Sequence, residues 1–206
     1  SIKSVIEGFF DTGLVDEVVV VDNNSIGNTR EEVAKTKATM VHEVKQGYGY
    51  AIMRGLIEAK GDLVVMTEAD GTFLPGDIEK LLAYSGEFDA ILGTRTSRSA
   101  IWSGAFMPFP VRFGNWLWAK IVEVLFNGPV LTDVGCTYKL INRNLLEEIK
   151  GYFKYSKGDG TFSPELMIWL LKKNKNIIEI PVIYKQRVGK SGYTGSIWKA
   201  AKLGLK

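Results

Sequence analysis

Two carboxylates follow directly on an apolar run in the first half of the chain. Residues 63–67 form the run, and Glu68, Ala69 and Asp70 come next. In an extended chain, side chains two residues apart point to the same side at a spacing of about 6 to 7 Å, so Glu68 and Asp70 can face one ligand. Two hard oxygen donors beside a diphosphate suit Mg²⁺ or Mn²⁺. The alternative is a solvated turn, which acids and glycine after a strand also form.

Polar residues also follow an earlier β-branched run at residues 17–22. Asp22 ends that run, where a carboxylate is placed to accept from the N–H or hydroxyl groups of a ligand, and Asn23 comes next. The alternative is a cap for the following helix. Lys45 and Gly47 lie in a glycine-containing turn before a helix, where backbone can approach a diphosphate closely. An ordinary glycine-rich turn fits the same residues.

Basic side chains gather in the second half of the chain. Arg95 follows a strand and Arg112 opens the next helix, so both can reach a diphosphate or an anionic acceptor, whose oxygens a planar guanidinium binds in pairs. Lys139, Arg187 and Lys190 join them only if the fold brings them together. Each one alone is more often a solvated surface charge.

The elements that would position these residues alternate along the chain. Short apolar runs at residues 17–22, 39–44, 62–67 and 88–93 are separated by helical patterns at residues 29–37, 48–60 and 76–84. This order is typical of βαβ units, so we predict an α/β fold with a mostly parallel central sheet flanked by helices. After residue 93 the order changes to a loop at 94–110, a helix at 111–126, a strand at 136–141, a helix opened by Ser163, Pro164 and Glu165, and a strand at 177–184.

The size and composition of the chain favour one globular domain over residues 1–206, with a nucleotide-binding half at 1–95 and an acceptor half at 96–206. The net charge is only +3 and both signs are mixed along the chain, which argues against a nucleic-acid partner. A single cysteine, Cys136, excludes an internal disulfide framework and a cysteine-based zinc site. The helical pattern is already under way at Ser1, so we expect the native N-terminus to be longer.

The helix predicted at residues 111–126 carries an apolar stripe that we expect to be buried. Its members are Phe113, Leu117, Ile121, Val124 and Leu125. This leaves Trp116 and Trp118 off the buried face. Together with the aromatic residues at 101–110 they suit either the core or a surface that lies on lipid headgroups.

Several motifs occur in one order along the chain. They are VVVDNNS at residues 19–25, KQGYG at 45–49, GD at 61–62 leading to EADG at 68–71, and GTR at 93–95. In this content and order the chain resembles family 2 glycosyltransferases over nearly its whole length. The resemblance is closest to dolichyl-phosphate and polyprenyl-phosphate sugar transferases, through RFGN at 112–115, TDVGCTYK at 132–139 and RVGKS at 187–191. Two features depart from the family pattern: Glu68 replaces the first acid of its D-x-D motif, and its first strand, with a P-x-x-N-E-E loop, is absent.

The resemblance implies a GT-A fold, a UDP- or GDP-linked sugar as donor, inversion at the anomeric carbon, and Mg²⁺ or Mn²⁺ on Asp70 and Glu68. The donor contacts it implies are Asp22, Asn23, Lys45, Gly47, Glu68, Ala69, Asp70 and Arg95. The acceptor or phosphate contacts are Arg112, Lys139, Arg187 and Lys190. The implied acceptor is a lipid phosphate, so the protein is expected in the cytoplasm, peripheral at the inner face of the membrane.

An inverting transfer needs an acceptor oxygen on the face of the sugar opposite the leaving diphosphate. A hydroxyl acceptor requires a carboxylate base, for which we predict Asp133, with Glu165 as its rival. An acid in a first helical turn, such as Glu165, is also ordinary dipole stabilisation. A lipid phosphate is already anionic, so with that acceptor Asp133 would only have to position it or balance charge. The competing functions are transfer to a glycan hydroxyl, a nucleotidyltransferase, and a non-catalytic subunit that binds nucleotide sugars.

Overall fold

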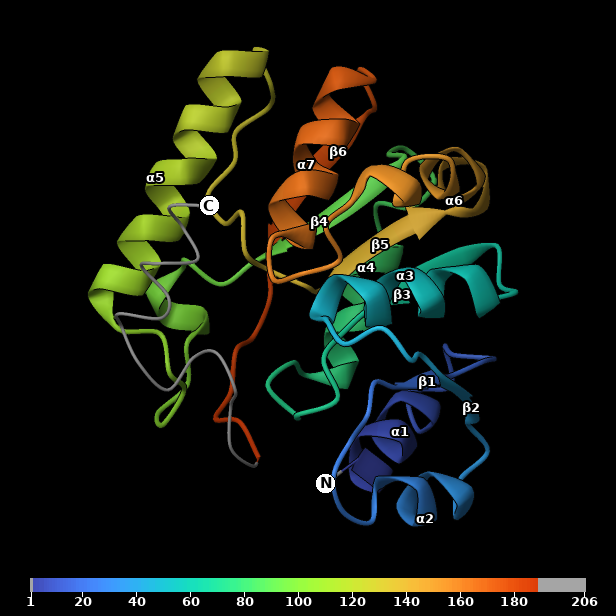
Figure 1. The fold of residues 1–206 in the computed structure, drawn as a ribbon. Coiled ribbons are helices and arrows are strands. Elements are labelled where there is room, and N and C mark those ends of the chain that lie inside the picture. Colours follow the sequence, from blue (N-terminus) through green and yellow to red (C-terminus); the bar gives the residue numbers. More distant parts are fainter. Residues whose placement is uncertain (1, 189–206) are drawn as a thin grey trace.

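The computed structural model describes residues 2–188, in which helices and strands alternate (Figure 1). The strands are β1 (Val19–Asp22), β2 (Thr39–His42), β3 (Leu63–Met66), β4 (Ala90–Thr94), β5 (Lys139–Asn142) and β6 (Ile177–Pro181). The α-helices are α1 (Ile2–Phe10), α2 (Thr29–Ala34), α3 (Tyr48–Glu58), α4 (Ile78–Leu82), α5 (Phe109–Phe126), α6 (Arg143–Lys150) and α7 (Phe162–Lys172). Short 3₁₀ turns are η1 (Pro75–Asp77), η2 (Arg98–Ala100) and η3 (Phe153–Tyr155).

The strands form two sheets. β1 and β2 make a parallel pair, and the other four lie in the order β3, β5, β4, β6. Within this sheet β5 is antiparallel to both β3 and β4, and only β4 and β6 are parallel. The α/β class is confirmed, but the prediction of a mostly parallel central sheet is wrong, because the sheet is mixed. An apolar run marks where a buried strand lies and carries no information about its direction.

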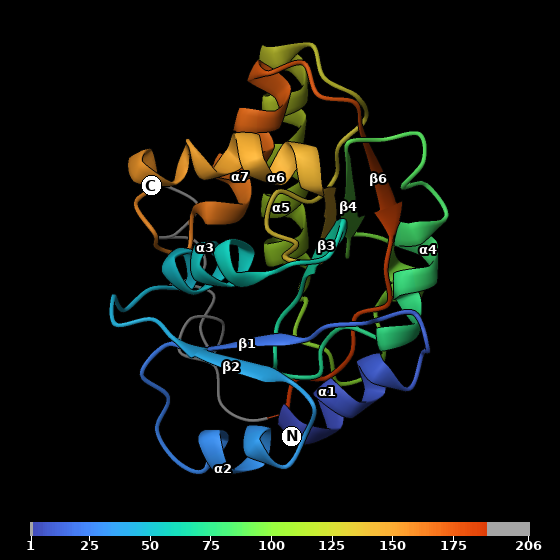
Figure 2. The same cartoon turned by 90° about the vertical axis from the view of Figure 1, so that its right-hand side faces the viewer.

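Alternating side chains of the four-stranded sheet face two apolar cores. On β4, Ala90 and Leu92 face the core shared with α3, α5, α6 and α7, whereas Ile91 faces the core shared with α4 and α1. Figure 2 shows these helices on either side of the sheet. Every residue of β4 is buried, so the strand that leads into Arg95 is fixed from both faces.

A third, smaller core lies between the β1–β2 pair and helices α1 and α2. It is built from Ile2, Ile6 and Val33, with Val20 and Met40 packed against it. These helices and strands form the lower part of the molecule in Figure 1. The small core fixes the end of β1, and therefore the position of Asp22.

The predicted helices and strands are present, with boundaries that differ at their ends. One helix, α6, was not predicted. The Asn142 side chain caps it by accepting from the Leu145 N–H at 2.8 Å. Since Leu145, Leu146 and Ile149 are its buried residues, the helical spacing that identifies it is present in the sequence.

The prediction for the apolar stripe on α5 is wrong. The buried residues of α5 are Ala119 and Val122, while Val124 and Leu125 are 78% and 71% exposed. Phe109, Phe113, Leu117, Trp116 and Trp118 are exposed as well. Periodicity locates a stripe but does not say which neighbour covers it, and here α5 packs inward through small side chains. Within residues 2–188, no helix is long and apolar enough to cross a membrane.

Candidate active site

The segment after β3 carries the two predicted metal ligands. Asp70 Oδ1 accepts from the main-chain N–H of Thr72 at 3.0 Å and from its hydroxyl at 2.6 Å. The other carboxylate oxygen, Oδ2, is buried without a hydrogen bond, and Arg187 Nη2 lies 2.6 Å from it as an ion pair. One oxygen is thus fixed by the protein, and the other has only a neighbouring positive charge.

Glu68 lies beside Asp70 and shares its cation. Glu68 Oε1 accepts from the Thr137 hydroxyl at 2.9 Å, and Oε2 accepts from Arg187 Nη2 at 2.9 Å. Burial and the negative charge of Asp70 raise the pKa of Glu68 above its usual value. A cation placed between the two carboxylates therefore stabilises the ionised form of both acids.

The donor set fits a divalent metal. Asp70 and Glu68 each have one carboxylate oxygen held by a threonine and one oxygen directed at a shared cation. Within the described part of the chain, no group of three His, Cys, Asp or Glu side chains could hold a metal ion. Two carboxylates are the usual protein share for Mg²⁺, which takes its remaining ligands from phosphate and water.

Asp133 lies in a second cluster, where it binds Arg95. Arg95 Nε and Nη2 donate to the two Asp133 oxygens at 2.8 and 3.0 Å, and the Arg95 main-chain N–H adds a bond of 2.9 Å. Burial alone would raise the pKa of Asp133, but the charge and hydrogen bonds of Arg95 outweigh it and lower that pKa. An ionised carboxylate with its lone pairs occupied is a poor proton acceptor. This geometry disfavours Asp133 as the predicted base and makes it the group that positions Arg95.

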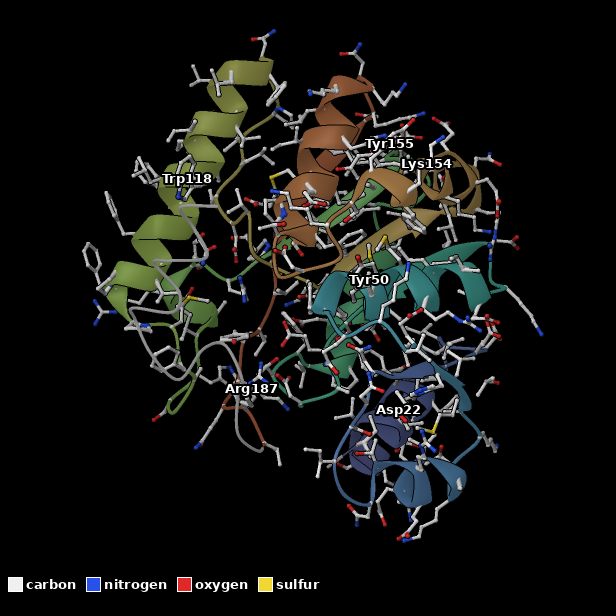
Figure 3. The ribbon with its side chains drawn as sticks, viewed as in Figure 1. Asp22, Tyr50, Trp118, Lys154, Tyr155 and Arg187 are labelled. Carbon is white, nitrogen blue, oxygen red and sulfur yellow. The ribbon has the colours of Figure 1, made fainter. Side chains whose placement is uncertain are left out.

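Asp22, labelled in Figure 3, lines a pocket that Ala69 also lines. The pocket measures about 560 Å³ and is lined by Ile2, Val20, Val21, Asp22, Ser25, Asn28, Thr29, Glu32 and Ala69. Ala69 lies between the two acids in sequence, so the pocket adjoins them. Asp22 itself is buried, and its oxygens accept from Ser25 and Arg30, whose hydrogen bonds hold its pKa far below the usual value.

The predicted donor residues on the loop before α3 make contacts within the protein. Asn23 donates to the carbonyl oxygens of Glu43 and Lys45 at 2.9 and 2.7 Å, and its own oxygen accepts from Gly47 N at 2.9 Å. A Cβ at Gly47 would collide with the carbonyl oxygen of Gly158. The glycine is thus required by a close approach of protein backbone, and the Lys45 ammonium lies 5.5 Å from the centre of the Tyr50 ring.

Two of the other predicted site residues have protein partners. Lys139 is 1% exposed, and its ammonium donates to the Cys136 carbonyl oxygen. Because a ligand cannot reach this buried ammonium, the prediction that Lys139 contacts an acceptor is wrong. Glu165 accepts from the hydroxyls of Ser156 and Thr161 at 2.7 and 2.6 Å, which braces the loop before α7.

Arg112 lies in the first turn of α5, with its guanidinium 5.9 Å from the centre of the Phe109 ring. It is half-buried and stays a predicted anion contact. Lys190 lies outside the described residues.

Four residues of the site were missed by the sequence reasoning. Thr72 and Thr137 orient the two acids, and the Tyr48 hydroxyl is hydrogen-bonded to Thr137. Tyr184 lies between the clusters, since the Arg95 guanidinium is 5.2 Å from its ring centre. Burial raises the pKa of Tyr184, and the charges of Arg95 and of both acids act on it. Tyr48 and Thr137 lie within the KQGYG and TDVGCTYK motifs, which gave no role to either residue. Thr72 also had a sequence signal, because a hydroxyl two residues after an Asp commonly closes such a turn.

Comparison with known proteins identifies similar chains. A family model described as Glycosyl transferase family 2 matches residues 1–150. The low-salt glycan biosynthesis hexosyltransferase Agl6 of Haloferax volcanii is 29% identical over 192 residues, which are 92% of this chain and 44% of the relative. The dolichyl-phosphate hexose transferase of the same organism is 28% identical over 176 residues, which are 85% of this chain and 72% of the relative. This chain therefore spans less than half the length of the first relative.

A solved structure has the same fold. Glucosyl-3-phosphoglycerate synthase from Mycobacterium tuberculosis, crystallised with Mn²⁺, UDP and glucosyl-3-phosphoglycerate, superposes with a TM-score of 0.71 at 19% identity. The match covers 99% of this chain and 71% of the other. The predicted GT-A fold is confirmed.

Proposed function

Because this chain belongs to glycosyl transferase family 2, we propose that it transfers a hexosyl group from a nucleotide-diphosphate sugar to a lipid phosphate. The observation that carries this proposal is the pocket of about 560 Å³ whose lining includes both Asp22 and Ala69. Its volume lies in the range of small-molecule sites and suits the nucleoside of UDP or GDP. At its Ala69 end the diphosphate would meet Asp70 and Glu68, which would hold Mg²⁺ or Mn²⁺. A bound divalent ion supplies electrostatic stabilisation of the leaving diphosphate.

The protein groups around the acid pair hold it in place before any ligand arrives. Thr137 fixes one oxygen of Glu68 and Thr72 fixes one oxygen of Asp70. Arg95, locked by Asp133, adds a fixed positive charge that acts on Glu68. Groups that need not reorganise during the reaction stabilise developing charge best.

Both candidate bases, Asp133 and Glu165, are already bound to other protein groups, which favours a phosphate acceptor over a hydroxyl. A hydroxyl must lose a proton as it attacks, whereas a phosphate oxygen is already anionic. Asp133 is bound to Arg95, and Glu165 accepts from two hydroxyls. A relative of this chain is named a dolichyl-phosphate hexose transferase, which agrees with this acceptor class.

A transfer assay tests this function. The chain is incubated with Mn²⁺, radiolabelled UDP- and GDP-hexoses, and either polyprenyl phosphate or the matching polyprenol. We expect label in the phosphate lipid alone, with release of nucleoside diphosphate. Equal labelling of polyprenol would overturn the acceptor. Release of pyrophosphate would indicate a nucleotidyltransferase, and donor binding without transfer would indicate a non-catalytic subunit.

The exposed face of α5 supports a peripheral position on the membrane. Phe113, Leu117, Val124 and Leu125 face outward along the helix, and Trp116 and Trp118 flank them. Figure 3 shows α5, with Trp118, at the edge of the molecule. An apolar helix face bordered by tryptophan is typical of interfacial helices that lie among lipid headgroups. An acceptor carried by the membrane requires such a contact.

Two matched variants test the membrane face. Val124 on α5 and Val44 before α3 are 78% and 72% exposed, so a glutamate at either position should leave the fold intact. We expect Val124→Glu to reduce sedimentation with vesicles of phosphatidylglycerol and phosphatidylcholine several-fold, and Val44→Glu to leave it unchanged. Equal binding by both variants would exclude α5 as the contact, whatever the outcome of the transfer assay.

A further inference from the structure

One nitrogen atom of Arg187 serves both acids of the site. Nη2 lies 2.9 Å from Glu68 Oε2 and 2.6 Å from Asp70 Oδ2. The remaining oxygens of the two acids accept from Thr137 and Thr72. Figure 3 shows Arg187 beside the loop that follows β3. The oxygens that a metal would need are therefore those that face the guanidinium.

A metal ion and this guanidinium cannot occupy the same place. Mg²⁺ binds oxygen at about 2.0 to 2.1 Å, so an ion shared by Glu68 Oε2 and Asp70 Oδ2 would overlap with Nη2 of Arg187. The metal ion and the Arg187 guanidinium would also repel each other at such a short separation. Binding of one requires that the other leave.

The backbone on both sides of Arg187 is anchored. Lys185 N–H donates to the Thr72 carbonyl oxygen at 2.7 Å, and Val188 N–H donates to the Asp70 carbonyl oxygen at 2.9 Å. The chain that carries Arg187 thus pairs with the chain that carries Asp70. Its side chain is 29% exposed. Only the flexible side chain has to move, and it can do so while the pairing stays intact.

We propose that Arg187 is an internal counter-cation: its guanidinium occupies the metal position between Glu68 and Asp70 until a metal-bound diphosphate binds. The metal alone must displace Arg187 and leaves the guanidinium without a partner. A diphosphate supplies anionic oxygens that receive it, because a guanidinium binds phosphate in a bidentate manner. Metal and nucleotide binding are therefore coupled through Arg187, and each strengthens the other. This inference rests on the proposed function only in that the diphosphate belongs to a nucleotide sugar.

Mn²⁺ binding, followed by electron paramagnetic resonance, tests this coupling without any transfer step. The chain and its Arg187→Gln variant are titrated with Mn²⁺ alone and with UDP or GDP present. We expect the variant to bind Mn²⁺ alone about 5-fold or more tightly than the wild type, within the usual range of coupling between sites. We also expect the nucleotide to raise its Mn²⁺ affinity less than it does for the wild type.

Arg54→Gln is the matched control, because Arg54 is ion-paired with Glu58 on α3 at 2.8 Å, whereas Arg187 is the ion-pair partner of Glu68 and Asp70. It should bind Mn²⁺ as the wild type does. Equal or weaker Mn²⁺ binding by Arg187→Gln would overturn the proposal, even if hexosyl transfer is observed.

Discussion

Two arginine–carboxylate clusters meet at Tyr184, and they satisfy their oxygens to different degrees. Asp133 receives three donors from Arg95 alone, and its side chain is fully buried. Glu68 and Asp70 share one nitrogen of Arg187, and their side chains keep 23% and 11% of their surface exposed. The cluster of Arg95 and Asp133 is saturated and closed, whereas the cluster of Glu68, Asp70 and Arg187 is open and its two acids share one cation.

This difference between the two clusters indicates which one stabilises the fold and which one binds a ligand. A saturated, buried ion pair has no lone pair to offer a ligand, and removing one of its partners leaves an uncompensated buried charge that destabilises the protein. Two adjacent acids that share a single cation repel each other, which lowers stability until a metal ion is bound, and this is the property expected of a binding site. The first cluster should therefore control stability and the second should control activity.

The largest expected effect belongs to the saturated cluster. Asp133→Asn leaves the Arg95 charge buried and unpaired, which costs about 3 to 5 kcal/mol. Urea unfolding followed by circular dichroism measures the loss. Arg54→Gln, which breaks the partly exposed pair with Glu58, is the control and should cost about 1 kcal/mol or less.

A double variant sharpens this measurement. Arg95→Met with Asp133→Leu removes both charges and should recover much of the stability, because an apolar pair of similar volume fits a buried site. If Asp133→Asn unfolds at the same urea concentration as the wild type, the two clusters do not differ in the way described.

The open cluster should show the reverse behaviour. Asp70→Asn keeps an oxygen to accept from Thr72 but loses the charge that would hold the metal, so transfer should fall by about 10²- to 10³-fold. Thermal unfolding should stay close to that of the wild type. Asp11→Asn, at an exposed acid after α1, is the control for both measurements. Transfer at the wild-type rate by Asp70→Asn would remove the acid pair from the mechanism.

Much of the fold was predictable because apolar periodicity is a local property. The order of strands and helices follows from runs such as residues 63–67, and the GT-A fold from the motifs between them. The direction of β5 and the partner of α5 were not predictable, since both depend on what lies across the sheet or helix. The α5 stripe has the same helical spacing whether it faces the core or the solvent.

The sequence could predict those site residues that follow the end of a strand. Glu68 and Asp70 lie just after β3, as the sequence predicts, and their role as metal ligands stays a prediction. Asp133 was expected to be a base, although its partner Arg95 lies 38 residues away in sequence and nothing in the spacing reveals the pair. Arg187 is 119 residues from Glu68, so only the fold shows that it lies between the acids.

The smallest expected effect tests whether the open cluster is destabilising without metal. Burial and Asp70 raise the pKa of Glu68 above the value of 4.5 that it has in the unfolded chain. The folded state therefore favours the protonated acid, and ionisation destabilises the fold as pH rises through the raised pKa. At pH 7 with a chelator, Glu68→Gln should be more stable than the wild type, and this advantage should vanish below pH 4.5.

Added Mn²⁺ should reverse the sign of that difference. A metal that binds only the folded state stabilises it in proportion to its occupancy, and the Glu68→Gln variant has lost one of the two charges that bind it. Urea midpoints at pH 7, with chelator and then with Mn²⁺, measure both differences for one pair of proteins. A Glu68→Gln variant that is less stable under both conditions would mean that Arg187 and Thr137 already satisfy the acid. The open cluster would then be as saturated as the pair of Arg95 and Asp133, and the distinction between the two would fail.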